Sequence, residues 1–519
     1  MVKGILLNKK SLFLGLDLGT SSLKAIVVDE KGKIKAVARR GYSICSPQTG
    51  WAEQDPEEWW RATLQVIQDL TSTGVDFSLV KGIGLSGQTH GMVIVDKNFR
   101  PLRKAIIWLD QRSYSQIKRI DREKLNRMTQ ITGIPLYPGF MASSILWMRD
   151  SEPHLLEKAR YFLLPKDYLR IKLTHQAATD VSDAAGTFLL DTRKRSWSEY
   201  ILGEVGISKN LLPPLYESTE ITGSIAKDVS ERTHLPEGVP LCAGGADQVM
   251  GAVGNKIVED GDSACIVGTG GQLVSCISQP LVGVDKGLHT IPHAVKERWI
   301  LMGAILSAGI SLSWFINRVL LDKGVSGEDE VNWDLLIGTV PSYPAIKKGL
   351  FFLPYLKGER TPHLDPGARG LFIGLCLDHS RGDLIRAIME GVAFAFRDCI
   401  EMMRLMGISP GKMICSGGGG KNKIWRQILS DVLGVSLYSV NSREQSAYGA
   451  ALTAAVATGF FSSLKEGCNE WIDIYPDTSP SAFSSLYQQG YRIYRQFYPL
   501  LKEKFHLLSK MEKDYEAVE

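Results

Sequence analysis

The chain has 519 residues, of which 44% are hydrophobic and 22% charged, and its formal net charge is +4. This length exceeds one ordinary core and predicts two large domains, and the small net charge gives no support for a nucleic-acid or membrane-surface partner. The eight cysteines are scattered without a CxxC pair. That spacing argues against a zinc finger or a thioredoxin-like motif and agrees with a reducing compartment.

The N-terminal segment carries only a few apolar residues before three polar ones, which is not the pattern of a signal peptide. No apolar run reaches the roughly 18 residues that a membrane-spanning helix needs. From these two observations we expect a cytoplasmic protein without a membrane span.

The first half is predicted to begin with a hairpin, because apolar segments at 11–18 and 23–29 flank the turn Gly-Thr-Ser-Ser. Residues 57–69 show helical spacing of apolar side chains. Residues 81–85 are predicted to form a strand, and 92–95 its hairpin partner or continuation. Residues 240–245 then lead into Asp247, and a short helix is predicted at 248–255.

The second half opens on the same plan, with strands at 261–267 and 272–277 around the turn Gly-Thr-Gly-Gly. The copies lie about 250 residues apart, which favours an internal repeat. Helices are predicted at 381–405, 424–433, 444–458 and 491–519, a strand at 412–415, and a glycine turn at Gly417–Gly420. The pattern indicates an α/β fold divided into domains 1–255 and 256–519.

The two hairpins are candidate phosphate-binding elements. The chain has no GxxxxGK[ST] motif, so it is not a P-loop protein, and its glycines do not fit a Rossmann fingerprint. In the first hairpin, backbone N–H groups and hydroxyls can donate to phosphate oxygens, Lys24 can offset their charge, and Asp17 can hold Mg²⁺ through water. The hydroxyls are those of Thr20, Ser21 and Ser22. The alternative is an ordinary polar hairpin.

The second hairpin, with Thr269 and Gly270, has the same chemistry, and two hairpins from two domains can hold a triphosphate between them. Gly418, Gly419 and Asn422 lie where a strand gives way to a helix. Glycines there let a flat ring approach the backbone, and the Asn422 amide can orient that ring. A flexible entry into the helix is the alternative.

Asp247 is the candidate catalytic base. It follows a Gly-Gly-Ala segment and precedes the predicted helix at 248–255. A phosphoryl-transfer enzyme needs a carboxylate aimed at the attacking hydroxyl. The alternative is that Asp247 is the N-cap of this helix, and both roles are compatible because a helix N-terminus favours an ionised carboxylate.

Two further segments are candidate sugar contacts. Gln88, Thr89 and His90 stand between glycines, and Trp108 lies two residues before Asp110. A sugar needs a planar apolar wall and paired hydrogen-bonding groups, and these side chains offer both. Arg112 is either a sugar contact or the structural ion-pair partner of Asp110, and a lone histidine is more often structural.

In these segments, and in several longer ones, the chain resembles the FGGY carbohydrate kinases. The resemblance runs from about residue 15 to 460 and includes GLDLGTS near the N-terminus. It also includes GWAEQDPEEWW (50–60), LPKDYLRIKL (164–173), DVSDAAGT (180–187), LPYLKGERTP (353–362) and ARGLFIG (368–374).

This resemblance implies two ribonuclease-H-like domains, as in actin and hexokinase, with ATP, Mg²⁺ and sugar in an interdomain cleft. It implies that Asp247 deprotonates a sugar hydroxyl and that Thr89, His90, Trp108, Asp110 and Gln248 lie at sugar positions. It places Thr269, Gly309, Ser313, Gly418 and Asn422 at nucleotide positions.

Within the family, the chain is most similar to members that phosphorylate D-xylulose. It departs from them at Thr89, where they usually carry Met, at Gln248, where many carry Asn, and at Ser143-Ser144, where the pattern is Pro-Lys. The substrate therefore stays open among D-xylulose, D-ribulose, another pentulose and a polyol, and glycerol is less favoured. The resemblance also implies a possible homodimer. An actin-like ATPase or a regulatory pseudokinase is the non-enzyme alternative, but neither would need a sugar-sized polar pocket beside Asp247.

Overall fold

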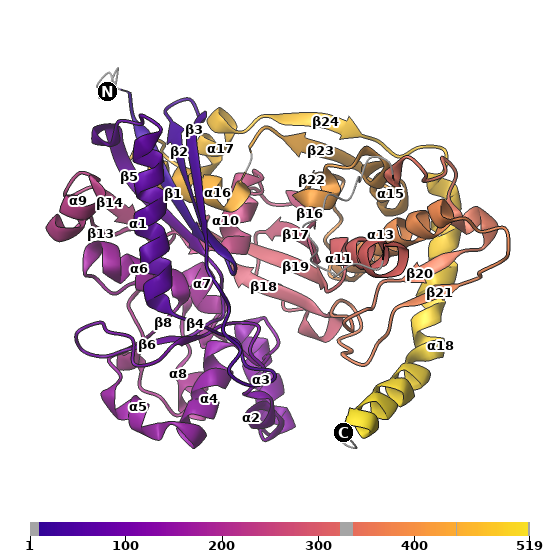
Figure 1. Cartoon of the computed structure of the whole chain (residues 1–519), viewed down its shortest axis with the longest axis horizontal. Coiled ribbons are helices and arrows are strands. Elements are labelled where there is room, and N and C mark those ends of the chain that lie inside the picture. Colours follow the sequence, from indigo (N-terminus) through magenta and orange to yellow (C-terminus); the bar gives the residue numbers. More distant parts are fainter. Residues whose placement is uncertain (1–9, 322–335, 443, 517–519) are drawn as a thin grey trace.

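A computed structural model describes residues 10–321, 336–442 and 444–516. Two seven-stranded sheets organise the chain, one in each of two lobes (Figure 1). The first lobe is built on the sheet ordered β13-β14-β5-β1-β2-β3, with β15 also paired to β5. The second lobe is built on the sheet ordered β18-β19-β17-β16-β22-β23-β24. This arrangement agrees with the predicted α/β fold.

The first sheet consists of β1 (Leu12–Leu18), β2 (Ser22–Asp29), β3 (Ile34–Gly41), β5 (Val80–Gly87), β13 (Ile221–Ser224), β14 (Pro240–Cys242) and β15 (Gly245–Ala246). Its outer face is covered by α1 (Pro56–Ser72), α6 (Pro165–Thr174) and α9 (Lys227–Thr233). Asp55 caps α1 by accepting a hydrogen bond from the Glu57 N–H, and Pro56 occupies the first turn, where its missing N–H costs nothing.

The lower part of the first lobe is made of shorter elements. They are β4 (Glu53–Gln54), β6 (Val93–Val95), β7 (Ala105–Ile106), α2 (Tyr114–Lys118), α3 (Arg122–Thr132), α4 (Met141–Ser151), α5 (Pro153–Lys158), β8 (Tyr161–Leu163), β9 (Thr179–Asp180), α7 (Val181–Ala185), β10 (Leu190–Asp191), β11 (Ser196–Trp197), α8 (Glu199–Val205) and β12 (Leu215–Tyr216). The prediction that 92–95 pairs with or continues the strand before it was wrong, because β6 pairs with β8. The sequence does not show that the chain returns about 65 residues later to supply this partner.

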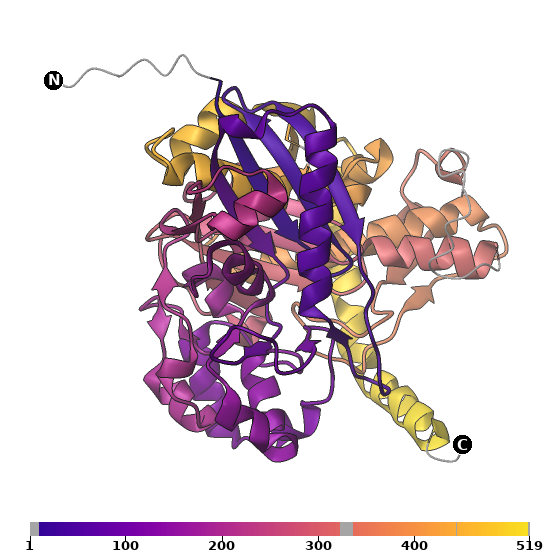
Figure 2. The ribbon, with the colours of Figure 1, turned by 60° about the vertical axis from the view of Figure 1, so that its left-hand side comes forward.

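The second sheet consists of β16 (Ser263–Val267), β17 (Gly271–Ile277), β18 (Leu288–Pro292), β19 (Trp299–Ile305), β22 (Lys412–Ser416), β23 (Ser436–Val440) and β24 (Ile474–Thr478). Around it lie α11 (Gly309–Trp314), β20 (Phe351–Leu353), β21 (Leu371–Ile373), α13 (Arg381–Leu405), α14 (Gly417–Gly420), α15 (Lys423–Leu433) and α18 (Ser484–Glu516). The predicted glycine turn is a single helical turn, α14. Helix α18 begins at Ser484, earlier than predicted, and extends away from the second lobe (Figure 2).

A central layer separates the two sheets. It contains α10 (Asp247–Gly254), α16 (Gln445–Ala457) and α17 (Leu464–Trp471). Helix α16 comes from the second half of the chain but packs on β1 and β5, and Cβ atoms at Gly15 or Gly84 would lie within about 2 Å of its backbone. These glycines are required because the helix approaches the sheet directly. Hydrophobic side chains of this layer form one core with side chains from both sheets.

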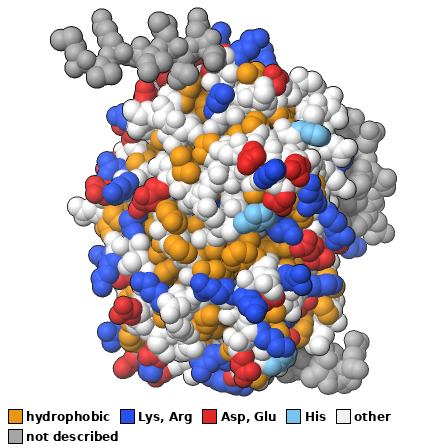
Figure 3. Space-filling model, turned by 90° about the vertical axis from the view of Figure 1, so that its left-hand side faces the viewer, with side chains coloured by type: hydrophobic (Ala, Val, Ile, Leu, Met, Phe, Trp, Pro, Cys, Tyr) orange, Lys and Arg blue, Asp and Glu red, His pale blue; other side chains and the backbone are white. Residues whose placement is uncertain are grey.

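Charged side chains of both signs are intermixed over the outer face of the first lobe (Figure 3). This distribution agrees with the small net charge. Among the described residues, no helix has the length and apolar composition needed to cross a membrane.

Candidate active site

The edge of the first sheet brings three predicted site segments together. β5 runs parallel to both β1 and β15, and Ser86 lies opposite Asp17 on one side and Gly245 on the other. Since the carboxyl ends of parallel strands meet at one edge, Asp17, Gln88 and Asp247 converge there. Gly244 has φ +69°, and a Cβ atom there would lie 2.0 Å from the Leu85 carbonyl oxygen, so only glycine fits before β15.

Asp247 is the first residue of α10, and Ala246 is the N-cap. The Asp247 carboxylate accepts one hydrogen bond, from the Gln248 N–H at 2.7 Å, so it does not cap the helix in the usual N2 or N3 pattern. Burial and then the negative charge of Asp17 raise the pKa of Asp247 to about 7, although the side chain keeps part of its surface open to solvent. A carboxylate with that pKa is suited to accept a proton near neutral pH.

Asp17 is the second carboxylate of this edge. Ser86 Oγ donates a hydrogen bond to it at 2.8 Å, and burial raises its pKa. Lys24 lies opposite Asp17 in the hairpin, but its ammonium group pairs with Glu444, the residue before α16. Lys24 therefore joins the hairpin to the second half of the chain, and its predicted role beside phosphate stays a prediction.

The first hairpin is held by side chains around it. Trp108 Nε1 donates to Thr20 Oγ1 at 2.9 Å, and Gln54 Nε2 donates to the Thr20 carbonyl at 2.7 Å. Arg39 donates to Ser22 Oγ, and the Ser21 side chain is exposed. The turn is thus fixed in place.

Gln88 and His90 lie next to this edge. The Gln88 side chain is buried and donates to Gln54, while its Oε1 atom has no partner. His90 Nδ1 lies 2.7 Å from the Gly186 carbonyl oxygen, and its ring stacks on Phe140 at 3.8 Å. A carbonyl oxygen only accepts hydrogen bonds, so Nδ1 carries the proton. Burial lowers the pKa of His90 to about 4, which leaves the ring neutral with Nε2 as an acceptor.

Thr89 and Gln248 offer hydrogen-bonding groups beside the predicted catalytic residues. The Thr89 hydroxyl is buried next to the Asp183 carboxylate, and a Cβ atom on Gly186 would lie 2.0 Å from its Oγ1. The Gln248 side-chain amide has no hydrogen-bond partner among the described residues, and the residue is only partly buried. Both positions flank Asp247 or His90, where the sequence predicts sugar contacts.

Asp110 and Arg112 form the structural ion pair that the sequence left as an alternative. Arg112 Nη2 lies 2.8 Å from both Asp110 and Glu53, and its guanidinium stacks 3.6 Å from the Trp51 ring. The Asp110 carboxylate also accepts hydrogen bonds from backbone N–H groups, and both side chains are almost fully buried. The pair therefore stabilises the turn that carries Trp108.

A buried charge cluster lies behind the Asp247 loop. Lys166 Nζ lies 2.7 Å from Asp167, 2.8 Å from Asp180 and 3.3 Å from Asp183. Burial raises the pKa of Asp183 well above its usual range. Ser182 Oγ donates to Asp180 and accepts the Ala246 N–H at 3.2 Å, which ties the cluster to the residue before Asp247. Ser182 lies in the segment 180–187, and no local pattern in the sequence indicates this contact.

The predicted nucleotide residues gather at one edge of the second sheet. The Gly309 N–H donates to the Gly268 carbonyl at 2.9 Å, and the Thr269 carbonyl accepts from the Ala308 and Ile310 N–H groups. Gly417 has φ +84°, and a Cβ atom there would lie 2.5 Å from the Val267 carbonyl oxygen. The hairpin, α11 and α14 therefore meet at the carboxyl ends of β16 and β22.

The side chains at this edge are few. Thr269 is exposed, Ser313 lies partly buried on α11, and Asn422 caps α15 by accepting from the Trp425 N–H at 3.0 Å. A Cβ atom on Gly270 would lie 2.8 Å from the Ile305 carbonyl, whereas one on Gly418 or on Gly411, which precedes β22, would meet no protein atom within 4 Å. The edge thus presents backbone rather than charge.

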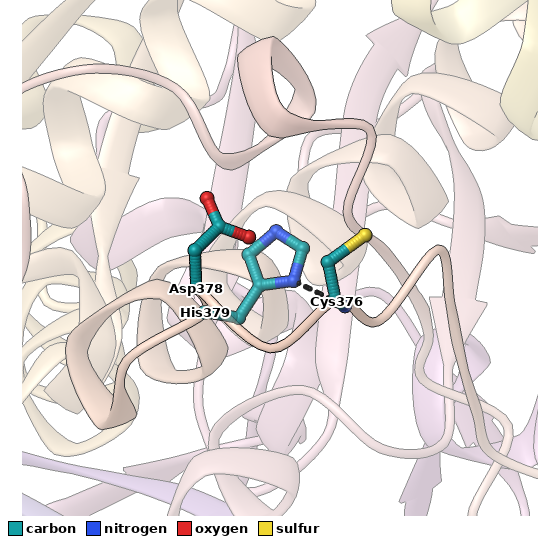
Figure 4. A group of neighbouring side chains, drawn as sticks. All are labelled: Cys376, Asp378 and His379. Atoms are coloured by element: carbon teal, nitrogen blue, oxygen red, sulfur yellow. Dashed lines mark hydrogen bonds between the residues drawn. The ribbon is translucent and has the colours of Figure 1, made fainter.

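Away from these edges, one group of side chains has metal-ligand chemistry. The ligand atoms of Cys376, Asp378 and His379 all lie within 4.8 Å of one another in the turn before α13 (Figure 4). His379 Nδ1 accepts the Cys376 N–H at 2.8 Å, so the neutral ring carries its proton on Nε2. Neither ring nitrogen then has a lone pair available to bind a metal ion, so the geometry does not support a metal site in this exposed turn.

Two lobes of α/β architecture, with paired carboxylates on one sheet edge and glycine-rich turns on the other, define an enzyme-like arrangement. The chain matches the N-terminal domain of the FGGY family of carbohydrate kinases over residues 12–254 and the C-terminal domain over 263–458. It is 35% identical to the xylulose kinase of Bacillus subtilis, covering 96% of this chain and 99% of that protein. It is 37% identical to the xylulose kinase of Escherichia coli, covering 88% and 92%.

The structure is also similar to the crystal structure of a "xyloylose kinase" from Brucella ovis. The TM-score is 0.86 at 32% identity, and the match covers 95% of this chain and 99% of that one. The chain therefore belongs to the FGGY family of carbohydrate kinases. This confirms the family and the fold class that the sequence predicted.

Proposed function

We propose that this chain transfers the γ-phosphoryl group of ATP to a ketose, with D-xylulose as the first candidate, and that Asp247 is the base. The observation that carries the proposal is the pairing of Asp247 with Asp17 at the edge of the first sheet, where burial and repulsion raise the pKa of Asp247 to about 7. The relatives named as xylulose kinases, which match almost the whole chain, support the choice of sugar.

In this proposal the sugar lies between Asp247 and the hydrogen-bonding side chains around His90. His90 Nε2 accepts from one hydroxyl, and Thr89, Gln88 and Gln248 bind others, while Trp108 supplies the apolar wall. Asp247 takes the proton of the attacking hydroxyl. Because the transition state of phosphoryl transfer is loose, the main contribution of these residues is to orient that hydroxyl.

ATP is proposed to lie along the edge of the second sheet and to reach the first hairpin with its phosphates. The exposed turn that carries Thr269 lies at that edge, and the turn Gly417–Gly420 leaves room for a ring beside Gly418. Thr20, Ser21 and Ser22 are proposed phosphate contacts from the opposite lobe. The two sets come from different lobes, so closure of the lobes would bring the γ-phosphate to the sugar.

The residues present fit Mg²⁺ as the partner of ATP. Asp17 at the end of β1 and Asp247 after β15 lie at the same edge of the sheet, and the charge of Asp17 acts on Asp247. A divalent cation with oxygen ligands would relieve this repulsion, and Asp17 is the proposed holder through water. When bound with ATP, the ion neutralises charge on the phosphates.

The proposal is tested by measuring ADP release with a panel of ketoses and polyols and comparing kcat/KM. We expect D-xylulose to give the highest value, followed by D-ribulose or another pentulose. If no sugar in the panel increases ADP release above the rate without sugar, the proposed function is wrong.

A further inference from the structure

The second lobe presents one face of β18 to the first lobe. Leu288 belongs to the core of the second lobe, whereas Ile291 belongs to the core shared by both lobes. Because side chains alternate along a strand, His289 lies on the same face as Ile291 and faces the first lobe. This face contacts α7, the helix next to Gly186, on which His90 is anchored.

The loop after β20 brings Arg360 to the same place. Glu359 accepts the Leu306 N–H at 3.0 Å, which anchors the loop on the end of β19. Thr361 Oγ1 accepts the Ala304 N–H at 2.9 Å and donates to the Gly287 carbonyl at 2.7 Å. Arg360 is therefore fixed between two anchors, next to the start of the strand that carries His289.

Arg360 forms no ion pair within the described part of the chain, although its charge acts on the neighbouring Glu359. Its guanidinium lies 4.8 Å from the ring of Tyr137, a residue of the first lobe. Its positive charge contributes to the low pKa values of both His90 and His289. The guanidinium therefore lies beside the predicted sugar contact His90 and offers donors that no described carboxylate uses.

His289 is buried with an unsatisfied ring nitrogen. The residue is 5% exposed, and Nε2 has no hydrogen-bond partner. Burial and Arg360 keep the ring neutral, with a pKa of about 3. A buried nitrogen without a partner is unfavourable unless a ligand completes it. A chain of ring contacts links His289 to His90. The ring centroids lie 6.5 Å apart between His289 and Tyr137, 5.7 Å between Tyr137 and Phe140, and 3.8 Å between Phe140 and His90. His289 therefore lies on the His90 side of the predicted sugar site.

We propose that Arg360 and His289 bind the carbonyl end of the ketose, at the other end of the sugar from the hydroxyl that faces Asp247. The inference rests on the proposed function and assigns the second lobe a share of sugar recognition. A guanidinium only donates hydrogen bonds and a ketone oxygen only accepts them, so the two match. His289 matches the ketone oxygen as well in the tautomer that carries its proton on Nε2, and this tautomer is part of the proposal. The alcohol of the corresponding polyol brings an additional proton that needs an acceptor, which disfavours it beside Arg360.

The test compares Arg360→Lys, Arg360→Ala, His289→Gln and His289→Ala with the unmodified chain. We expect Arg360→Ala to raise KM for D-xylulose by about 10-fold to 100-fold, and the histidine variants by roughly 5-fold to 20-fold, with kcat changed less than KM. The preference for D-xylulose over its polyol, xylitol, falls in Arg360→Ala, and Arg360→Lys retains part of it. Arg381→Ala and His154→Ala are matched controls on exposed surface and leave KM unchanged.

Sugar binding is measured by calorimetric titration of D-xylulose into each variant. Folding is measured by the midpoint of thermal unfolding of each variant, with and without sugar. Loss of the sugar-induced rise in this midpoint, with the sugar-free midpoint unchanged, supports the inference. Unchanged KM and unchanged sugar affinity in Arg360→Ala and His289→Ala overturn it. A lower sugar-free midpoint with a normal sugar-induced rise also overturns it, because that result indicates a structural contact between lobes. If the unmodified chain phosphorylates none of the sugars, the proposed function itself fails.

Discussion

The two hairpins that begin the two sheets share one plan and differ in chemistry. In the first, Asp17 stands two residues before the turn glycine and lies opposite Lys24. In the second, the same place before Gly268 is taken by Ile266, which lies opposite Gln272. Side chains hold the first turn, and backbone groups of α11 hold the second. A repeated backbone has therefore acquired a charged site on one lobe and a neutral, glycine-lined site on the other.

The largest difference between the roles of the two lobes is expected in the activity of Asp247→Asn. The amide cannot accept the proton of the attacking hydroxyl, so we expect kcat to fall by roughly a thousand-fold or more, with binding of ATP retained. Steady-state ADP release with D-xylulose and a nucleotide-binding titration measure the two quantities. Asp285→Asn, an exposed aspartate of the second lobe, is the control and stays fully active.

Asp247→Asn is also expected to be more stable than the unmodified chain at alkaline pH. A carboxyl whose folded pKa is raised from 3.8 to about 7 binds its proton more tightly in the folded state, so its contribution to stability is lost as pH rises through 7. Asp247→Asn removes this loss and raises the free energy of unfolding at pH 8 by about 1 kcal/mol, since the side chain is partly solvated. Equal stability of both proteins at pH 5 and pH 8 contradicts the raised pKa.

Asp17→Ile makes the first hairpin resemble the second. We expect activity to fall by about a hundred-fold, because both the proposed Mg²⁺ contact and the partner of Ser86 are lost. Asp17→Asn keeps the shape of the side chain but removes its charge, which lowers the pKa of Asp247. The residual activity of this variant is therefore expected to rise at a lower pH than that of the unmodified chain. A pH profile of kcat/KM for Asp17→Asn that does not move shows that Asp17 has no influence on Asp247.

Ser182→Ala tests whether the buried cluster positions Asp247. The Ser182 hydroxyl accepts the N–H of the residue before Asp247, so its loss is expected to reduce kcat by about 10-fold with little change in KM. Ser182→Thr keeps the hydroxyl and restores most of the rate. If Ser182→Ala lowers stability while kcat stays normal, the cluster supports only the fold.

The smallest effect is expected from Gly418→Ala on the second lobe. An added Cβ meets no protein atom, so stability is unchanged and any effect reports on a ligand. We expect KM for ATP to rise about 3-fold to 10-fold, because the methyl group occupies space proposed for the base. Gly411→Ala, where the added atom also meets nothing, is the matched control. An unchanged KM for ATP removes Gly418 from the nucleotide site.

The sequence predicted the fold class and the family, because hairpins, glycine turns and long motif matches are local signals. It also placed Asp17, Gln88 and Asp247 among the site residues, which parallel pairing to β5 then brings together. It did not reveal His289 or Arg360 as candidates, although the match at 353–362 contains Arg360. Their place depends on loop anchors and on the packing of one lobe against the other, which no local pattern records.

The sequence also left a role open where a residue can be either a ligand contact or a structural contact. Arg112 and Asp110 have the composition of a sugar site but are buried as an ion pair against Trp51. The pairing of β6 with β8 was missed because the partner strand is distant in sequence. Helix α16 was predicted, but its packing on the first sheet follows only from the close approach at Gly15 and Gly84.

The pH dependence of kcat/KM for D-xylulose tests the role of Asp247 most directly. If Asp247 is the base, with a pKa of about 7 in the free enzyme, kcat/KM rises about 10-fold per pH unit below that value and levels above it. The rise disappears from the residual activity of Asp247→Asn. A kcat/KM that stays constant between about pH 5.5 and 8.5, or an unchanged rise in Asp247→Asn, contradicts the assignment.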